Sequence, residues 1–500
     1  MRTPPDSSLV DQWGRHRRRR RVVPGWVLGI VGVALLAALA LAIWIRTRPP
    51  APWLPPSGAP SFSKCDYQGE LAAWCAQVAV PEDPSKPAGR TISLRLTVVP
   101  ATAKPARGAL FYLEGGPGGA ASASAIRVNQ LFAKVGRTRD LVMVDQRGAG
   151  GSSALSCPDR HVRAADAAAV TAYLRSCFAG LRRDPRLYTT SVAADDLDAA
   201  RRTLGYGRID VYGGSYGATL AQVFLRRHPA SVRTVVLDGG SLPDVRIYER
   251  TAANAQRALD GQLARCAAAP ACRRAFPHVR RELDALLARA PRRVTIPQGS
   301  FLLGPDEVAW TIAALSSTAD GAALIPFTVD TAAHGDYRPL ARAFSDDVGA
   351  ELDARARLVM VWEILCSEPW AALDPAATAR DARGSYLAHA ALARARLFRR
   401  ACAVVPRGRV PAGSGSVVGS RAPVLLLAGG EDPLDPAANL RGWRRAYPDG
   451  TLVVVPAEGH GTIESPCVQS IVARFVARAS ATGLDAACAA HVSPPPFLTG

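Results

Sequence analysis

The sequence contains very little lysine, so arginine carries almost all of its positive charge. The lysines are Lys64, Lys86, Lys104 and Lys134, whereas the formal net charge at pH 7 is +19. No Lys/Arg block alternates with aromatic residues, although a nucleic-acid groove requires a concentrated basic surface of that kind. We therefore expect no nucleic acid among the partners of this protein.

The sequence also lacks a Cys-x-x-Cys pair and a Gly-Lys-Ser/Thr segment. The first absence argues against a zinc or dithiol redox site, and the second argues against a loop that holds nucleotide phosphates. We expect neither a metal nor another cofactor.

The ten cysteines form couples of sequence neighbours. The couples are Cys65 and Cys75, Cys157 and Cys177, Cys266 and Cys272, Cys366 and Cys402, and Cys467 and Cys488. We interpret them as five local disulfides of an exported protein, because an oxidising compartment preserves such bonds. The alternative is ten buried free thiols, and spacing alone leaves the connectivity open.

A stretch without charge covers residues 25–45 and has a tryptophan near each end. Its length suits the hydrocarbon core of a bilayer, and tryptophan favours the two interfaces. Arginine is more abundant before this stretch than after it. We therefore predict a cytoplasmic tail at 1–21 and a transmembrane signal-anchor at 22–45, with the rest of the chain outside the cytoplasm. The alternative is a cleaved signal peptide and secretion, because Ala38-Leu39-Ala40 resembles a processing site.

Apolar runs alternate with helical spacing through much of the remaining chain. This pattern predicts an α/β fold with a mostly parallel sheet that helices cover on both faces. The strands that we expect are Thr91–Val99, Ala109–Leu113, Leu141–Val144, Ile209–Tyr212, Val232–Leu237, Val424–Leu427 and Thr451–Val455.

The alternation stops between residues 243 and 415, where Ala/Arg/Leu-rich helical segments dominate and no strand is predicted. We interpret 243–415 as an inserted helical cap. The core then consists of 61–242 and 416–500, and a proline-rich linker at 46–60 precedes it.

A candidate nucleophile lies in Ile209–Gly217, an apolar run that ends in Gly-x-Ser-x-Gly. A helix is predicted to follow at Ala218–Arg227. A serine between a strand and a helix, with glycines on both sides, can occupy a sharp turn with its hydroxyl exposed. This context makes Ser215 the expected nucleophile.

Two of the expected strands are followed by the residues that a nucleophilic serine needs. Asp432 follows Val424–Leu427, and His460 follows Thr451–Val455. Because the carboxyl ends of parallel strands share one edge of a sheet, Ser215, Asp432 and His460 can converge there as a triad. Glu431 and Asp435 are the substitutes for Asp432.

An oxyanion also needs backbone donors, one of them from the residue after the nucleophile, Tyr216. The second is expected from the glycine-rich loop at residues 114–119, which follows Ala109–Leu113. We choose Gly116 because Pro117 has no N–H group. The alternative is a plain glycine-rich turn or a phosphate loop.

Several of these segments together resemble the prolyl and tripeptidyl aminopeptidase branch of the α/β-hydrolases. They are Gly115-Gly116-Pro117-Gly118-Gly119, Asp145-Gln146-Arg147-Gly148-Ala149-Gly150, Gly213-Gly214-Ser215-Tyr216-Gly217, Asp432-Pro433 and Gly459-His460-Gly461. The resemblance covers roughly residues 65–490. It implies an α/β-hydrolase core with a helical cap, and release of residues or short peptides from free N-termini.

Two residues depart from the pattern of the family. Glu114 stands where prolyl iminopeptidases carry histidine, and this favours the secreted tripeptidyl-like subgroup. Asp435 stands where the tripeptidyl enzymes often have threonine. The segment Cys366-Ser367-Glu368 resembles a Cys-x-Glu/Asp segment of the family, so Glu368 is the candidate that would bind the amine of the substrate. The alternative for Glu368 is a solvated carboxylate at a helix end.

We therefore expect a serine hydrolase that acts through an acyl-enzyme, most simply an exported aminopeptidase of tripeptidyl or prolyl type. One alternative is a carboxylesterase or lipase with the same triad, and another is a non-catalytic hydrolase-fold envelope protein. The expected partners are a peptide or small ester substrate and the membrane. The oligomeric state is not predicted.

Overall fold

The computed structural model describes residues 60–158, 166–355 and 358–499. The predicted cytoplasmic tail (1–21), the transmembrane signal-anchor (22–45) and nearly all of the linker (46–60) lie outside the described residues. No helix in the described part of the chain is long and apolar enough to cross a bilayer.

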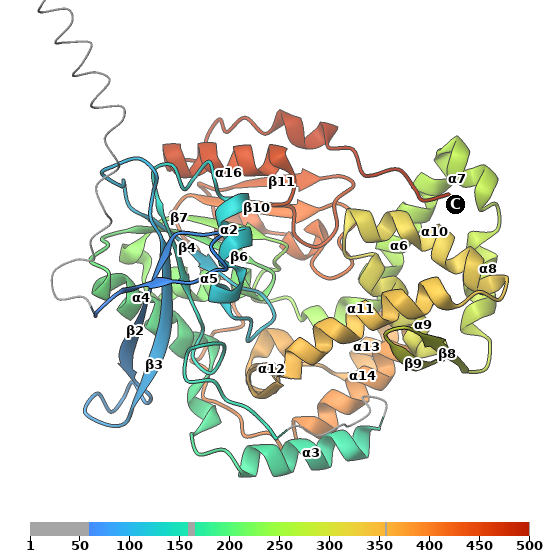
Figure 1. Cartoon of the computed structure of the whole chain (residues 1–500), viewed down its shortest axis with the longest axis horizontal. Coiled ribbons are helices and arrows are strands. Elements are labelled where there is room, and N and C mark those ends of the chain that lie inside the picture. Colours follow the sequence, from blue (N-terminus) through green and yellow to red (C-terminus); the bar gives the residue numbers. More distant parts are fainter. Residues whose placement is uncertain (1–59, 159–165, 356–357, 500) are drawn as a thin grey trace, which may run out of the picture. The chain divides into compact units, whose positions relative to one another are not determined.

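A nine-stranded sheet forms the core, with the strand order β1-β2-β3-β5-β4-β6-β7-β10-β11 (Figure 1). The strands are β1 (Ser63–Cys65), β2 (Ala73–Pro81), β3 (Thr91–Val99), β4 (Ala109–Leu113), β5 (Asp140–Val144), β6 (Ile209–Gly214), β7 (Val232–Asp238), β10 (Val424–Gly429) and β11 (Thr451–Val455). In this order, each strand from β5 to β11 is parallel to its neighbour. The strands β1, β2 and β3 are joined to the sheet by antiparallel pairing. The predicted mostly parallel sheet is thus confirmed.

Each predicted strand is present, but β1 and β2 were not expected from the sequence. Strand β2 has the sequence AWCAQVAVP, in which several alanines and a terminal proline weaken the strand signal. Its pairing with β3 along eight residue pairs supplies the stability that its composition does not.

The two faces of the sheet are covered by different helices, as expected for a parallel sheet. On one face, Phe111 of β4 belongs to a core cluster with side chains of α4 (Thr190–Thr203) and α5 (Tyr216–Arg227). On the other face, Leu110 and Tyr112 belong to a cluster with side chains of α2 (Ala125–Leu131) and α16 (Pro466–Arg478). All five residues of β4 are therefore buried, although their side chains alternate between the faces.

A largely helical segment is inserted between β7 and β10, as the sequence predicted. Its helices are α6 (Thr251–Ala268), α7 (Pro270–Ala275), α8 (Val279–Leu287), α9 (Pro305–Leu315), α10 (Ala319–Ala333), α11 (Arg338–Arg355), α12 (Leu358–Ser367), α13 (Pro375–Asp381) and α14 (Ala388–Ala401). Figure 1 shows α6 to α11 gathered beside the strands, and their side chains form a hydrophobic cluster of their own.

The expectation that this cap contains no strand was wrong. The antiparallel hairpin β8–β9 occupies Arg292–Ile296 and Gly299–Leu303. Both strands are short, and only the last residue of each is buried, so they lack the buried apolar run by which the core strands were recognised.

All ten cysteines are paired in the structure, in the five couples that the sequence suggested. The disulfides join Cys65 to Cys75, Cys157 to Cys177, Cys266 to Cys272, Cys366 to Cys402, and Cys467 to Cys488. Their Cα–Cα distances are 5.6, 5.2, 5.2, 5.1 and 6.0 Å in the same order, within the usual range for a disulfide. No cysteine of the described residues is a free thiol, so the structure contradicts the alternative interpretation.

Each disulfide closes a local loop. The second joins the segment before α3 (Ala167–Ala179) to that helix, and the third joins α6 to α7. The fourth joins the end of α12 to the residue after α14 within the cap, and the fifth joins α16 to the short helical turn η7 (Ala487–His491). The disulfides therefore link neighbouring elements within the core or within the cap, and none joins the core to the cap.

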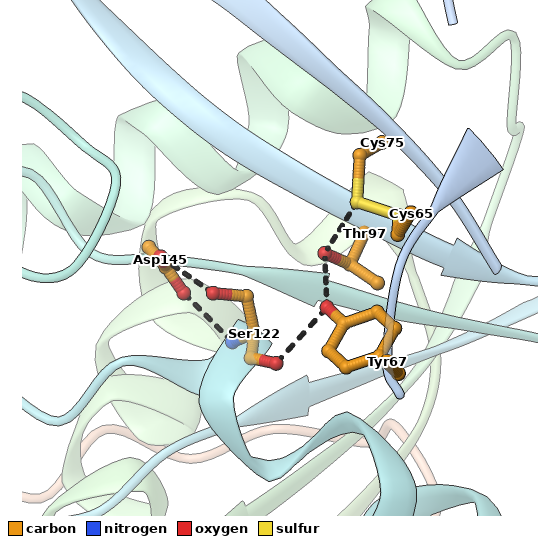
Figure 2. The surroundings of a disulfide bond; sticks show 6 residues. All are labelled: Cys65, Tyr67, Cys75, Thr97, Ser122 and Asp145. Atoms are coloured by element: carbon orange, nitrogen blue, oxygen red, sulfur yellow. Dashed lines mark hydrogen bonds between the residues drawn. A yellow bond between two sulfur atoms is a disulfide. The ribbon is translucent and has the colours of Figure 1, made fainter. Parts of the chain in front are cut away.

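Figure 2 shows the disulfide of Cys65 and Cys75 and the hydrogen bonds beside it. The Tyr67 hydroxyl donates to the carbonyl oxygen of Ser122 and lies 3.2 Å from Thr97 Oγ1. Ser122 in turn donates through its N–H and hydroxyl to Asp145, at 2.7 and 2.8 Å. The disulfide joins β1 to β2, and Tyr67, just after β1, connects the same part of the chain to Ser122, which follows the glycine-rich loop.

The turn between β6 and α5 is sterically restricted. Ser215 has φ 55° and ψ −125°, a left-handed conformation that side chains rarely adopt. A Cβ atom at Gly213 would lie 2.1 Å from the Gly217 carbonyl oxygen, and one at Gly217 would lie 2.2 Å from the Leu113 carbonyl oxygen. The two glycines of Gly-x-Ser-x-Gly are therefore required because backbone fills the space on both sides of the serine.

We predict that Gly213→Ala destabilises the protein by about 3 kcal/mol or more, because neither backbone segment can move away from the added methyl group. Gly207→Ala is the matched control, since a Cβ atom there meets no atom within 4 Å. The control is expected to change stability by less than about 0.5 kcal/mol. Denaturant unfolding of both variants measures the difference, and equal stability would contradict the packing argument.

Candidate active site

Ser215 lies at the wall of a cavity of about 250 Å³ between the core and the cap. The strained turn holds it directly after β6 and at the amino end of α5. Gly116 and Tyr216, the two predicted oxyanion residues, line the same cavity. The structure thus brings the expected nucleophile and both expected backbone donors to one place.

Asp432 and His460 form a hydrogen bond, with 2.9 Å between Asp432 Oδ2 and His460 Nδ1. The other oxygen, Oδ1, accepts the N–H groups of Leu434 (2.7 Å) and Asp435 (2.9 Å). Both oxygens of the buried carboxylate are therefore used, which fixes its orientation toward the imidazole. Neither Asp432 nor His460 is among the residues that line the cavity.

The charges around His460 stabilise its protonated form. Burial lowers the pKa of His460, but the carboxylates of Asp432, Asp435 and Asp238 outweigh this effect and raise the pKa to about 9. Burial also raises the pKa of Asp432, but the His460 imidazolium and the two N–H donors bring it below its ordinary value. The carboxylates therefore stabilise the imidazolium that forms when His460 accepts a proton, and the neutral imidazole that can accept one becomes more populated as the pH rises toward 9.

Backbone contacts connect the serine turn to the histidine loop. The Ser215 N–H donates to the Asp238 carbonyl oxygen at 2.9 Å. The next residue, Gly239, packs so closely that a Cβ atom there would lie 3.3 Å from His460 Nδ1. Among the described residues Ser215 Oγ makes no hydrogen bond to His460, and such bonds are commonly loose before substrate binds.

Asp238 is a positioning residue that the sequence interpretation missed. It is fully buried at the end of β7, and its carboxylate accepts the N–H groups of Thr462 and Ile463 at 2.9 to 3.0 Å. It also accepts the Tyr212 hydroxyl at 2.8 Å. Its position was the available signal. Asp238 follows the expected strand Val232–Leu237, just as Asp432 follows the expected strand Val424–Leu427.

The glycine-rich loop contacts the serine turn directly. A Cβ atom at Gly115 would lie 3.3 Å from Ser215 Cβ, and Gly116 has φ 122°, which favours glycine. Glu114 accepts the Gly115 N–H at 2.9 Å and the Ser124 hydroxyl at 2.5 Å. The residue that departs from the histidine of prolyl iminopeptidases thus holds the shape of this loop.

Glu368, the predicted amine-binding residue, lies behind the cavity wall rather than in it. Only 4% of the residue is exposed, and its Oε1 accepts the N–H of Thr190 at 3.0 Å. Thr190 Oγ1 lies 3.0 Å from the hydroxyl of Tyr216, which also accepts Gln146 Nε2 at 3.1 Å. Burial raises the pKa of Glu368. Glu368 is also absent from the residues that line the cavity.

Two charged residues line the cavity, Arg394, which the sequence did not indicate, and Asp435, which it indicated only as a substitute for Asp432. Asp435 accepts the Ser241 hydroxyl, and Arg394 lies over the rings of Tyr248 and Trp310, 5.1 Å from each centroid. The lining is otherwise largely apolar, with Leu242, Pro243, Val245, Ile247, Tyr248, Trp370 and Leu434. The other substitute for Asp432, Glu431, instead pairs with Arg265 at 2.8 Å.

A group of side chains that could bind a metal ion lies in the cap, away from this cavity. One donor atom each of Glu282, Asp330 and His334 lie within 4.8 Å of one another. The side chain of His334 is 70% exposed. No residue of this group lines the cavity beside Ser215.

Comparisons with known proteins match two parts of the chain. Residues 108–319 match a family model described as alpha/beta hydrolase fold, and residues 389–488 match one described as TAP-like protein. The chain has the α/β-hydrolase fold. The TAP-like match confirms the resemblance to the prolyl and tripeptidyl aminopeptidase branch.

Several curated relatives of this chain are named as peptidases. A tripeptidyl aminopeptidase of Streptomyces lividans is 31% identical over 201 residues, which cover 35% of this chain and 37% of that protein. Serine protease Hip1 of Mycobacterium bovis is 30% identical over 222 residues, covering 40% and 42%. A proline iminopeptidase of Neisseria gonorrhoeae is 28% identical over 130 residues, covering 26% and 32%. The chain spans less than half the length of these relatives.

A second buried carboxylate, Glu363, lies one turn before Glu368 in the α/β-hydrolase cap. It is completely buried, and although Oε1 accepts the Ser367 hydroxyl at 2.9 Å, Oε2 has no hydrogen-bond partner in the described structure. Burial raises the pKa of Glu363 to about 8. Since this value exceeds the ordinary one, the stability that Glu363 contributes is complete at about pH 4 and is lost as the pH rises through 8.

We predict that Glu363→Gln removes this part of the pH dependence of stability. The free energy of unfolding of the parent protein should fall between pH 5 and pH 9 by more than that of the variant, by at least about 1 kcal/mol. The control is Glu70→Gln, which replaces an exposed carboxylate. Parallel curves for the parent and Glu363→Gln would show that the buried group does not titrate in this range.

Proposed function

We propose that this protein is an exported serine aminopeptidase that removes residues or short peptides from free N-termini. The observation that carries the proposal is the Asp432–His460 hydrogen bond beside the strained Ser215 turn, at the wall of a mostly apolar cavity. The names of the relatives, tripeptidyl aminopeptidase and proline iminopeptidase, support a peptide with a free amine as the substrate.

In the proposed reaction, Ser215 Oγ attacks the scissile carbonyl carbon and transfers its proton to His460 Nε2. Asp432 is bonded to Nδ1, which leaves Nε2 to take the serine proton and stabilises the imidazolium that results. The N–H groups of Gly116 and Tyr216 stabilise the oxyanion, and that of Tyr216 is free of an intrahelical partner because it lies in the first turn of α5.

His460 then gives its proton to the leaving amine, and an acyl-enzyme on Ser215 remains. A water molecule transfers a proton to His460, attacks the acyl carbon and releases the N-terminal product, while Ser215 regains its proton. The reaction consumes one water molecule for each peptide bond that is cleaved.

The first test compares the full chain in detergent with its Ser215→Ala variant. The substrates are a tripeptide amide with a free N-terminus, the same peptide acetylated, and a short-chain ester. We expect cleavage of the free-amine peptide and a loss of kcat by about 10⁴-fold or more in the variant, because no other group replaces the nucleophile. Turnover of the ester alone would favour the alternative, a carboxylesterase or lipase. Activity that persists in Ser215→Ala would remove the proposed mechanism.

We also propose that residues 22–45 anchor the chain in the cell membrane, with the N-terminus in the cytoplasm. The uncharged stretch and its flanking arginines support this orientation, and the five disulfides fit an oxidising compartment.

The anchor predicts that a C-terminally tagged protein stays in the membrane pellet after alkaline extraction and keeps its full length. Protease added to intact cells, or to spheroplasts where an outer layer blocks it, should remove the tagged domain. A soluble, shortened chain that begins just after Ala40 or Ala42 would instead indicate a cleaved signal peptide and secretion.

A further inference from the structure

The cavity beside Ser215 contains a carboxylate that the proposed reaction does not use. Asp435 lines this cavity and is 6% exposed, so the small accessible part of the residue faces the cavity. A carboxylate is rarely buried without a cation, because removing its charge from water costs several kcal/mol. No arginine, lysine or histidine forms an ion pair with Asp435 among the described residues.

Hydrogen bonds hold Asp435 in place. Its N–H donates to Asp432 Oδ1 at 2.9 Å, which ties it to the same loop as the predicted triad residue. Its Oδ1 accepts the hydroxyl of Ser241, and Ser241 Oγ itself accepts Asn439 Nδ2 at 2.9 Å. Because Ser241 Oγ already accepts a hydrogen bond from Asn439, its hydroxyl proton is donated to Asp435. These bonds fix the orientation of the carboxylate.

The positively charged groups near Asp435 are engaged elsewhere, so a further cation can bind to its carboxylate. Burial raises the pKa of Asp435 to about 6, and His460 acts in the opposite direction, so the carboxylate is ionised at neutral pH. His460 is bonded to Asp432, and Arg257 of α6 also faces Asp432. Arg394 lies among the aromatic rings of the cap. An ammonium group entering the cavity is attracted to Asp435 and repelled from Arg394.

We infer that Asp435, rather than Glu368, binds the N-terminal ammonium group of the peptide substrate. This inference rests on the proposed aminopeptidase function and names its substrate-recognition group. The neighbouring walls are apolar, with Leu242, Val245, Ile247 and Trp370, so the favoured substrate has a free N-terminus and apolar side chains near it.

The surroundings of Glu368 point to a different role. Its Oε1 accepts the Thr190 N–H, and Thr190 Oγ1 contacts the Tyr216 hydroxyl. Glu368 therefore positions Tyr216, the residue beside the nucleophile, through one intervening threonine. A residue that acts in this way affects every substrate that Ser215 attacks, whether or not the substrate carries an amine.

The experiment compares Asp435→Asn with Glu368→Gln in the full chain. Each variant removes a charge and leaves an oxygen that can still accept the existing hydrogen bond. The readout is kcat/KM for a tripeptide p-nitroanilide with a free amine, for its N-acetyl form, and for p-nitrophenyl butyrate. The last two substrates report changes at His460 that are unrelated to amine binding.

We expect Asp435→Asn to lower kcat/KM for the free-amine peptide about 100-fold more than for the two amine-free substrates, whose smaller and mutually equal change reports the loss of the Asp435 charge near His460. Glu368→Gln is expected to change all reactions by a similar factor. Asp435→Thr should reproduce the selective loss and serves as the second variant if Asp435→Asn does not fold. Thermal unfolding of each variant checks the fold.

Two outcomes would overturn the inference. One is an equal loss for all substrates in both Asp435 variants, and the other is an amine-selective loss in Glu368→Gln. Failure of the proposed function is separately visible, because the parent protein would then cleave the acetylated peptide as well as the free one, or only the ester.

Discussion

The arrangement around Ser215 depends on Asp238, the buried last residue of β7. Its carbonyl oxygen accepts the Ser215 N–H, and its carboxylate accepts the N–H groups of Thr462 and Ile463, which follow His460. One residue therefore sets the position of the serine turn relative to the histidine loop. This is possible because β6 and β7 are adjacent and parallel, and because β10 and β11 continue the same edge. Removing that carboxylate would leave several buried N–H groups without acceptors.

The cap contributes to the site from the opposite side. The backbone N–H of His460 donates to the carbonyl oxygen of Ser317 at 2.7 Å, and Ser317 lies just after α9. A Cβ atom at Gly459 would lie 2.3 Å from the same oxygen, so the histidine loop and the cap are in close contact. Tyr248, Trp370 and Arg394 then supply much of the cavity wall. The cap thus supports the histidine loop and also forms part of the cavity wall beside the serine.

Carboxylates outnumber cations near the predicted triad, and their positions separate their roles. Asp432 is bonded to His460, Asp238 is bonded to backbone N–H groups, and Glu368 is bonded behind Tyr216. Asp435 alone among these lines the cavity. A carboxylate whose hydrogen bonds are satisfied within the protein supports the structure, whereas one that faces a cavity without a cation is available to a ligand.

Much of this arrangement could be predicted from the sequence. Local signals were sufficient for β4, β6, β7 and β10, because each is a short apolar run that is largely buried on both faces. They were also sufficient for the edge strand β11, in which Val454 is exposed, because its run of three valines favours a strand. For Ser215 the signal was Gly-x-Ser-x-Gly, which needs its glycines where a strand turns sharply into a helix. The cysteine couples were likewise predictable, since sequence neighbours meet at low entropic cost.

The sequence did not reveal β2 or the β8–β9 hairpin, because pairing with neighbours rather than local composition stabilises them. It also did not distinguish Glu368 from Asp435. The burial of a carboxylate and the identity of its partners are set by segments far apart in the chain, such as Thr190 for Glu368 and Ser241 for Asp435, and only the tertiary structure brings these segments together.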